Sequence, residues 1–97
     1  MVKMQQEYFM YKGYPLVRNG NEIYYGYMSE PYVAWLQILH QNLQDGLEIA
    51  DKVRVYQMST DEKLNPMERI ANKADRTSLY DALDVAFTWL ERANKKD

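Results

Sequence analysis

Apolar and polar residues alternate along two long stretches of the chain, roughly 32–44 and 47–59. Such alternation is typical of strands with one buried face. The two stretches are separated by Asp45-Gly46, a preferred pair for a two-residue hairpin turn with positive φ at both positions. The pattern therefore predicts a long β-hairpin closed by this turn.

A two-residue turn also fixes which residues face each other across the hairpin. One predicted set is aliphatic and forms the expected core face, whereas the other is apolar at one end and charged at the other. The first set pairs Ile38 with Val53 and Leu36 with Val55, and the second pairs Trp35 with Tyr56, Val33 with Met58 and Gln37 with Arg54.

An earlier hairpin is predicted around Asn19-Gly20-Asn21, between strands at about 14–18 and 22–25. Its loop holds two or three residues, so its register stays open by one residue. Pro15 cannot donate to a ladder, which predicts that the first strand lies at an edge or begins near this residue.

Helical signals begin at Asn65, which precedes Pro66 and is followed three residues later by Glu68. This is a capping-box pattern with proline at the first helical position. It predicts a first helix that breaks near 75–77 and a second helix, capped by Thr77 or Ser78, that ends near Asn94. The apolar stripe of the second helix comprises Leu79, Ala82, Leu83, Ala86, Leu90 and Ala93, widened by Tyr80, Phe87 and Trp89.

These elements predict one domain over residues 1–97, with strands at about 8–59 and helices at about 66–94. The second helix must bury its stripe, and the sheet is the large apolar partner available. The expected fold is α+β: a four-stranded antiparallel β-meander with the C-terminal helices packed on one face. Leu83 and Leu90 are expected to be buried between helix and sheet.

Composition removes several classes of function. The chain has 97 residues, no Cys, one His and a formal charge of −2, which argues against thiolate and iron–sulfur chemistry and against a strongly anionic partner. The longest apolar run, 32–36, is far shorter than a membrane span of about 20 residues. No signal-peptide pattern is present, and the expected location is the cytoplasm.

Three segments together resemble a family of short bacterial proteins without an assigned function. The resemblance implies a compact cytoplasmic protein and supplies no catalytic residue or cofactor. The segments are Lys12-Gly13-Tyr14-Pro15-Leu16-Val17-Arg18 with Gly26, then Lys52-Val53-Arg54-Val55, and finally Glu68-Arg69-Ile70 with Leu79-Tyr80-Asp81-Ala82-Leu83-Asp84 and Trp89-Leu90-Glu91-Arg92-Ala93.

His40 is the one imidazole, and the predicted register places it opposite Asp51. Such a pair is either a general base or, as we expect, a structural polar pair near the hairpin tip. Asp81, Asp84 and Glu91 share one helix face and are interpreted as its solvated side. No catalytic residue, metal site or cofactor is predicted.

The second face of the long hairpin is the predicted interface or binding face. It is left without cover unless Tyr8–Tyr11 or the first helix folds over it, and its size favours a small non-enzymatic interaction module that self-associates as a homodimer. Its residues are Val33, Trp35, Gln37, Leu39, Lys52, Arg54, Tyr56 and Met58.

Two other functions stay open. Weak single-stranded nucleic-acid binding would use Trp35 and Tyr56 for stacking with Lys52 and Arg54 nearby, although the net negative charge does not favour it. A small hydrolase-like enzyme would depend on His40. The tyrosine-rich start of the chain is either a recognition surface or the lining of a small sheet.

Overall fold

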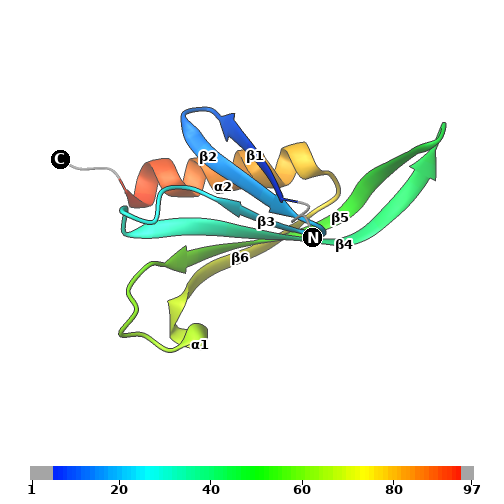
Figure 1. The fold of residues 1–97 in the computed structure, drawn as a ribbon. Helices are drawn as coiled ribbons and strands as arrows, with labels where there is room; N and C mark the ends of the chain where they lie inside the picture. The colour runs from blue at the N-terminus through cyan, green and yellow to red at the C-terminus, as the bar shows by residue number, and fades with distance from the viewer. Residues whose placement is uncertain (1–5, 95–97) are drawn as a thin grey trace, which may run out of the picture.

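Six strands form a single antiparallel sheet in the order in which they occur along the chain. This is seen in a computed structural model that describes residues 6–94 (Figure 1). The α+β class and the meander order are confirmed, but the sheet has six strands rather than four. The strands are β1 Gln6–Tyr11, β2 Tyr14–Asn19, β3 Glu22–Tyr25, β4 Tyr32–Gln44, β5 Leu47–Ser59 and β6 Ile70–Arg76.

The predicted turn between β4 and β5 is confirmed. Asp45 and Gly46 have φ of 51° and 81°, as a two-residue turn of this kind requires. The predicted pairs Ile38–Val53, Leu36–Val55, Trp35–Tyr56, Val33–Met58 and Gln37–Arg54 all lie opposite each other.

The register departs from the prediction at one place in this hairpin. A β-bulge or irregularity between Ile38 and Gln41 puts His40 opposite Lys52 in the backbone, not opposite Asp51. Such irregularities locally increase twist and redirect side chains. Beyond it the ladder resumes the predicted register as far as the turn.

The first hairpin has a two-residue loop, because Asn19 pairs with Glu22. Pro15 lies at the second position of β2, which agrees with a strand that begins near it. β2 is nevertheless not an edge strand, because β1 pairs along its whole length. Sequence reasoning missed β1 as a separate strand.

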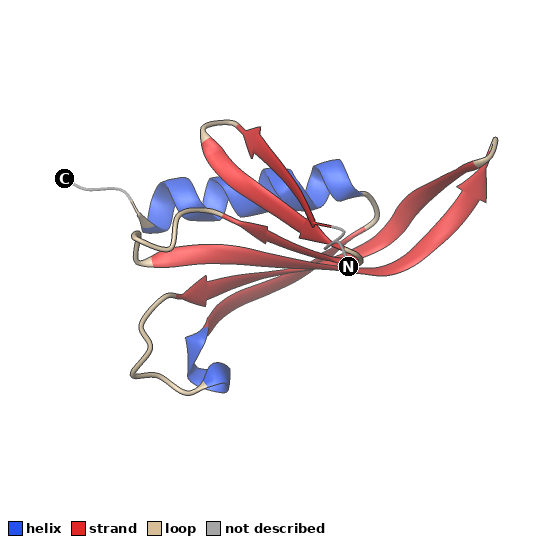
Figure 2. Cartoon of the chain, viewed as in Figure 1, coloured by secondary structure: helices blue, strands red, loops and turns tan. Residues whose placement is uncertain are grey.

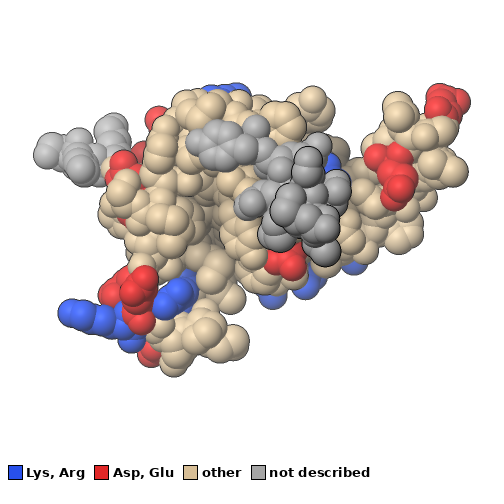
Figure 3. All heavy atoms as spheres, viewed as in Figure 1, with Lys and Arg blue, Asp and Glu red and all other residues tan. Residues whose placement is uncertain are grey.

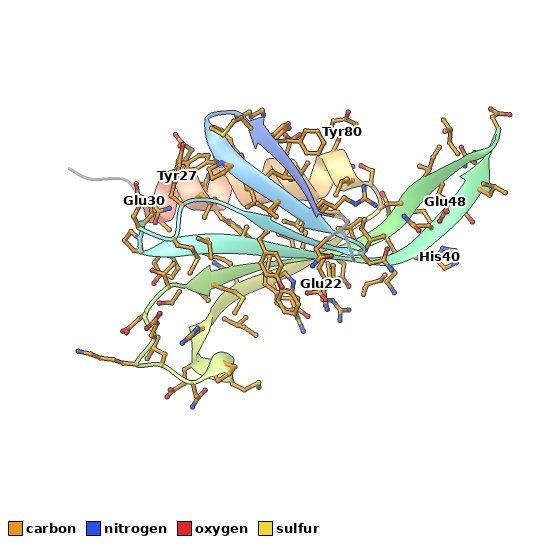
Figure 4. All side chains as sticks on the ribbon, in the orientation of Figure 1. Glu22, Tyr27, Glu30, His40, Glu48 and Tyr80 are labelled. Atoms are coloured by element: carbon orange, nitrogen blue, oxygen red, sulfur yellow. The ribbon has the colours of Figure 1, made fainter. Side chains whose placement is uncertain are left out.

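The second helix, α2 (Leu79–Ala93), is confirmed, with Ser78 as its N-cap. It lies across one face of the sheet, mainly over β4 and β5 (Figures 1 and 2). Tyr80 was predicted to widen the apolar stripe, but it is 75% exposed because it lies on the side of α2 that is turned away from the sheet (Figure 4). The core is formed by Leu16, Ile23, Tyr25, Ala34, Leu36, Ile38, Val53, Val55, Ala82, Leu83, Ala86 and Leu90.

The first helix was predicted too long. α1 spans only Pro66–Arg69, with the predicted capping box of Asn65 and Glu68. The chain then becomes extended and forms β6 against residues 53–58 of β5. This edge of β5 would otherwise keep unpaired backbone groups beside a buried core, so strand pairing outweighs the local helical preference.

We expect Leu90→Ala to lower the free energy of unfolding by about 2–5 kcal/mol, because it opens a cavity beneath the fully buried side chain. Tyr80→Ala, on the exposed side of the same helix, is the control and should change it by about 0.5 kcal/mol or less. Urea unfolding of both variants measures this. Equal effects would mean that α2 is not docked through its Leu90 face.

Candidate functional site

The face of the sheet opposite α2 is not covered by any helix of the described chain (Figure 2). We call it the open face. Because side chains alternate along a strand, it carries the residues between the buried ones of β4 and β5. Of the predicted binding residues, the structure brings Val33, Trp35, Gln37, Arg54, Tyr56 and Met58 together here.

An aromatic row crosses the centre of the open face. Tyr24 of β3, Trp35 of β4 and Tyr56 of β5 occupy paired positions, and Lys73 of β6 continues the row. The rings of Trp35 and Tyr56 stack with centroids 4.9 Å apart and an interplanar angle of 21°. Tyr24 is 50% exposed, so the row presents a partly accessible aromatic surface.

Glu22 accepts hydrogen bonds from two of the aromatic side chains in this row. Its Oε1 accepts from Trp35 Nε1 at 3.2 Å and from the Tyr24 hydroxyl at 3.0 Å. Burial and this hydrogen bond raise the pKa of Tyr24. The carboxylate therefore satisfies two aromatic donors and places a negative charge beside the rings; in Figure 4 Glu22 is seen on this face.

A second row of the open face is held by an ion pair. Arg54 donates from Nε to Asp75 Oδ1 at 2.7 Å and from Nη2 to Oδ2 at 3.1 Å. These hydrogen bonds lower the pKa of Asp75, and those to Asp75 and Tyr56 raise the pKa of Arg54. Tyr56 in turn donates to Gln37 at 3.4 Å. The polar groups of the open face are thus largely bonded to one another.

An apolar hollow of about 300 Å³ lies at the end of the open face nearest the β3–β4 loop. Sequence reasoning missed it, since its walls come from three strands and a turn. The sequence signal was the pair Tyr27-Met28, which is apolar within a turn; Met28 is 71% exposed. The lining residues are Pro15, Val17, Tyr24, Tyr25, Gly26, Tyr27, Met28 and Val33.

The β4–β5 hairpin continues far beyond the rest of the sheet as a two-stranded ribbon (Figure 1). We call residues 39–52 the arm. β3 pairs with β4 only as far as Gln37, and β6 pairs with β5 only from Val53. The predicted binding residues Leu39 and Lys52 lie at its base, both exposed. Its exposed large apolar residues are Leu39, Leu43, Leu47 and Ile49.

The charges of the arm have one sign apart from Lys52 at its base. Asp45, Glu48 and Asp51 are acidic, and residues 39–51 contain no Lys or Arg. In Figure 3 acidic side chains and no basic ones are seen toward the arm's tip. The apolar residues of the arm are therefore framed by negative charge.

His40 lies on the arm, outside the body of the molecule (Figure 4). Its Nδ1 is 2.7 Å from Asp51 Oδ1, and Asn42 donates to the other oxygen of Asp51. The side chains of His40 and Asp51 are therefore in contact, although the bulge shifts their backbone register. The His40 side chain is 62% exposed, and this shared carboxylate is typical of a structural polar cluster.

The helix carboxylates do not form a metal site. Asp84 accepts from Tyr11 and Lys12, and Glu91 accepts from the Tyr14 hydroxyl at 2.5 Å. Within residues 6–94, no three His, Cys, Asp or Glu side chains gather in a way that could hold a metal ion.

The tyrosine-rich start of the chain divides between two roles. Tyr11, Tyr14 and Tyr32 pack against the core and Tyr25 belongs to it, whereas Tyr24 and Tyr27 are exposed. Burial and the hydrogen bond to Glu91 raise the pKa of Tyr14 to about 12. Tyr14 and Glu91 also line a polar hollow of about 370 Å³ beside the end of α2.

No family model matches this chain, and neither a curated protein nor a solved structure shows a significant match to it. No helix of residues 6–94 is long and apolar enough to cross a membrane.

We expect stability to fall as the pH rises from about 10 toward 12. The raised pKa of Tyr14 means that the unfolded chain loses this proton first, so unfolding becomes more favourable over that range. Tyr14→Phe should flatten this part of the pH dependence, whereas Tyr80→Phe, at an exposed site, should not. Thermal melts between pH 8 and 12 measure the effect, and identical profiles for wild type and Tyr14→Phe would contradict it.

Proposed function

We propose that the chain is a small non-enzymatic interaction module that self-associates. The observation that carries the proposal is the apolar surface without cover in the described chain, on the open face and on the arm. Contiguous exposed apolar patches on soluble proteins often mark interaction sites. A two-fold homodimer is the simplest assembly for a self-complementary surface.

The open face and the arm differ in how far the interactions within one copy support them. On the open face, Trp35, Tyr24 and Arg54 all have side-chain hydrogen-bond partners within the same copy. The arm, in contrast, is a two-stranded ribbon, and an isolated ribbon of this kind is marginally stable in water. This difference supports the open face as a surface for a partner and the arm as a place of self-association.

Enzymatic function receives less support. His40 stands on the projecting arm and not in a cavity, and its ring is in contact with Asp51. A hydrolase needs a nucleophile or an activated water held beside its base within an enclosed site. Nothing of this kind surrounds His40 in the described chain.

Single-stranded nucleic-acid binding also receives less support. Stacking proteins combine exposed aromatic rings with a positive groove that follows the phosphates. Here Glu22 lies against the aromatic row, and Arg54 is already bound to both oxygens of Asp75. A phosphate backbone would meet a carboxylate at the centre of the face.

Sedimentation equilibrium from about 1 µM to about 500 µM tests self-association, with a reversible monomer–dimer equilibrium as the expected result. A protein that stays monomeric over the whole range would contradict the proposed function. Trp35→Glu, measured in the same way, shows whether the open face is itself the dimer contact, since a buried carboxylate there would disrupt it.

We expect no saturable change in tryptophan fluorescence when single-stranded oligo(dT) is added at low salt. The measurement uses Trp89→Phe, which leaves Trp35 as the one tryptophan in the chain. Circular dichroism checks that this variant is folded. Saturable quenching that disappears as salt is added would contradict the interaction-module proposal and favour nucleic-acid binding.

A further inference from the structure

The position beside the β4 strand of the arm is vacant in the described chain. β3 pairs with β4 from Ala34 to Gln37, and the last contact there is the Ile38 N–H donating to the Asn21 carbonyl at 2.8 Å. The β2–β3 hairpin turns back at this level. Residues 39–44 therefore have no strand of the described chain paired with them on this edge.

The edge strand β6 shows how this fold protects an edge. It carries Lys73, Asp75 and Arg76, and an irregularity in its register at Gln57 and Met58 of β5 distorts its ladder. Charged residues and bulges of this kind prevent pairing with another chain. The β4 strand of the arm, residues 39–44, has no Asp, Glu, Lys, Arg or proline.

The two edges of the arm differ in charge. The β5 edge carries Glu48 and Asp51, so an antiparallel copy would bring acidic groups together. The β4 edge reads Leu-His-Gln-Asn-Leu-Gln over residues 39–44. A short segment without Asp, Glu, Lys, Arg or proline that is rich in Asn and Gln has the composition of strands that pair with copies of themselves.

We propose that two copies of this chain associate by antiparallel pairing of the β4 edges of their arms, residues 39–44. The inference rests on the proposed self-association and names the surface that performs it. A two-fold axis beside Gln41 would place Gln41 of one copy opposite Gln41 of the other, because opposite residues of an antiparallel pair share a face. Leu39 would then lie opposite Leu43, and His40 opposite Asn42.

This arrangement closes after two copies, because each β4 edge is used once. The axis is perpendicular to the sheet, so the sheet of one copy continues into the other and both helices lie on the same side. The arm tip of one copy fills the space beyond the β2–β3 turn of the other. The acidic β5 strands of the two arms lie on the outside of the four-stranded centre, apart from each other.

Paired charge substitutions test the contact. In Gln41→Lys the introduced lysine faces its own copy across the axis, and in Gln41→Glu the carboxylate does the same. We expect each variant alone to have a dissociation constant at least about tenfold higher than the wild type. An equimolar mixture of the two should dimerise again, because opposite charges then meet. Loss of folding could not produce this rescue.

The matched control is Ile49→Lys, which makes the same change in net charge as Gln41→Lys but on the other strand of the arm. We expect it to dimerise like the wild type. The chain has no cysteine, so Gln41→Cys copies should also form a disulfide with one another, which Tyr80→Cys copies should not.

The outcomes separate the two proposals. A monomeric wild type overturns both the proposed function and the arm contact. A wild-type dimer that is insensitive to the charge pairs but lost in Trp35→Glu keeps the proposed function and moves the contact to the open face. Growth into open-ended aggregates in place of a dimer overturns the closed arm pairing. Dimerisation rescued only in the mixture, with Trp35→Glu still dimeric, supports it.

Discussion

The Asp45–Gly46 turn is the constraint on which the rest of the structure depends. A two-residue turn leaves one register, so Leu36 and Val55 lie on one face and Trp35 and Tyr56 on the other. The first face is then continuous enough to bury the stripe of α2. A slip of one residue in one strand would turn its side chains to the opposite face and leave the helix without a matching surface.

The sequence predicted the elements whose signal is local. The Asp-Gly turn, the Asn65 capping box and the stripe of α2 need only neighbouring residues, and all three are confirmed. β6 could not be predicted in this way, because Ile70 and Ala74 fit both helical and strand spacing. Pairing with the otherwise open edge of β5, which is distant in the sequence, favours the strand over the helix. The pair Lys12-Gly13, with positive φ at both residues, was the signal for the turn that β1 needs.

The candidate site likewise combines features that have a local sequence signal with features that depend on contacts distant in the chain. The register brought the residues of the open face together as the turn implied, whereas the hydrogen bonds of Glu22 and Asp75 with that face depend on β3 and β6. The isolation of the arm could not be read from β4 and β5 themselves, since it arises where their neighbours end. Its sequence looks like that of any half-buried strand. The arm is isolated because β3 begins at Glu22 and β6 ends at Arg76, both at the level of its base.

The arm and the open face serve one purpose in the proposed dimer. The open face of a single copy has few unsatisfied polar groups, so binding of the proposed partner would depend on apolar area and on the hollow lined by Tyr27 and Met28. Edge pairing about an axis perpendicular to the sheet leaves both open faces on the same side. A partner with two matching sites would then bind the second face at high effective concentration, without any new contact within each face. In the proposed dimer, self-association through the arm would therefore strengthen recognition on the open face while leaving that face free.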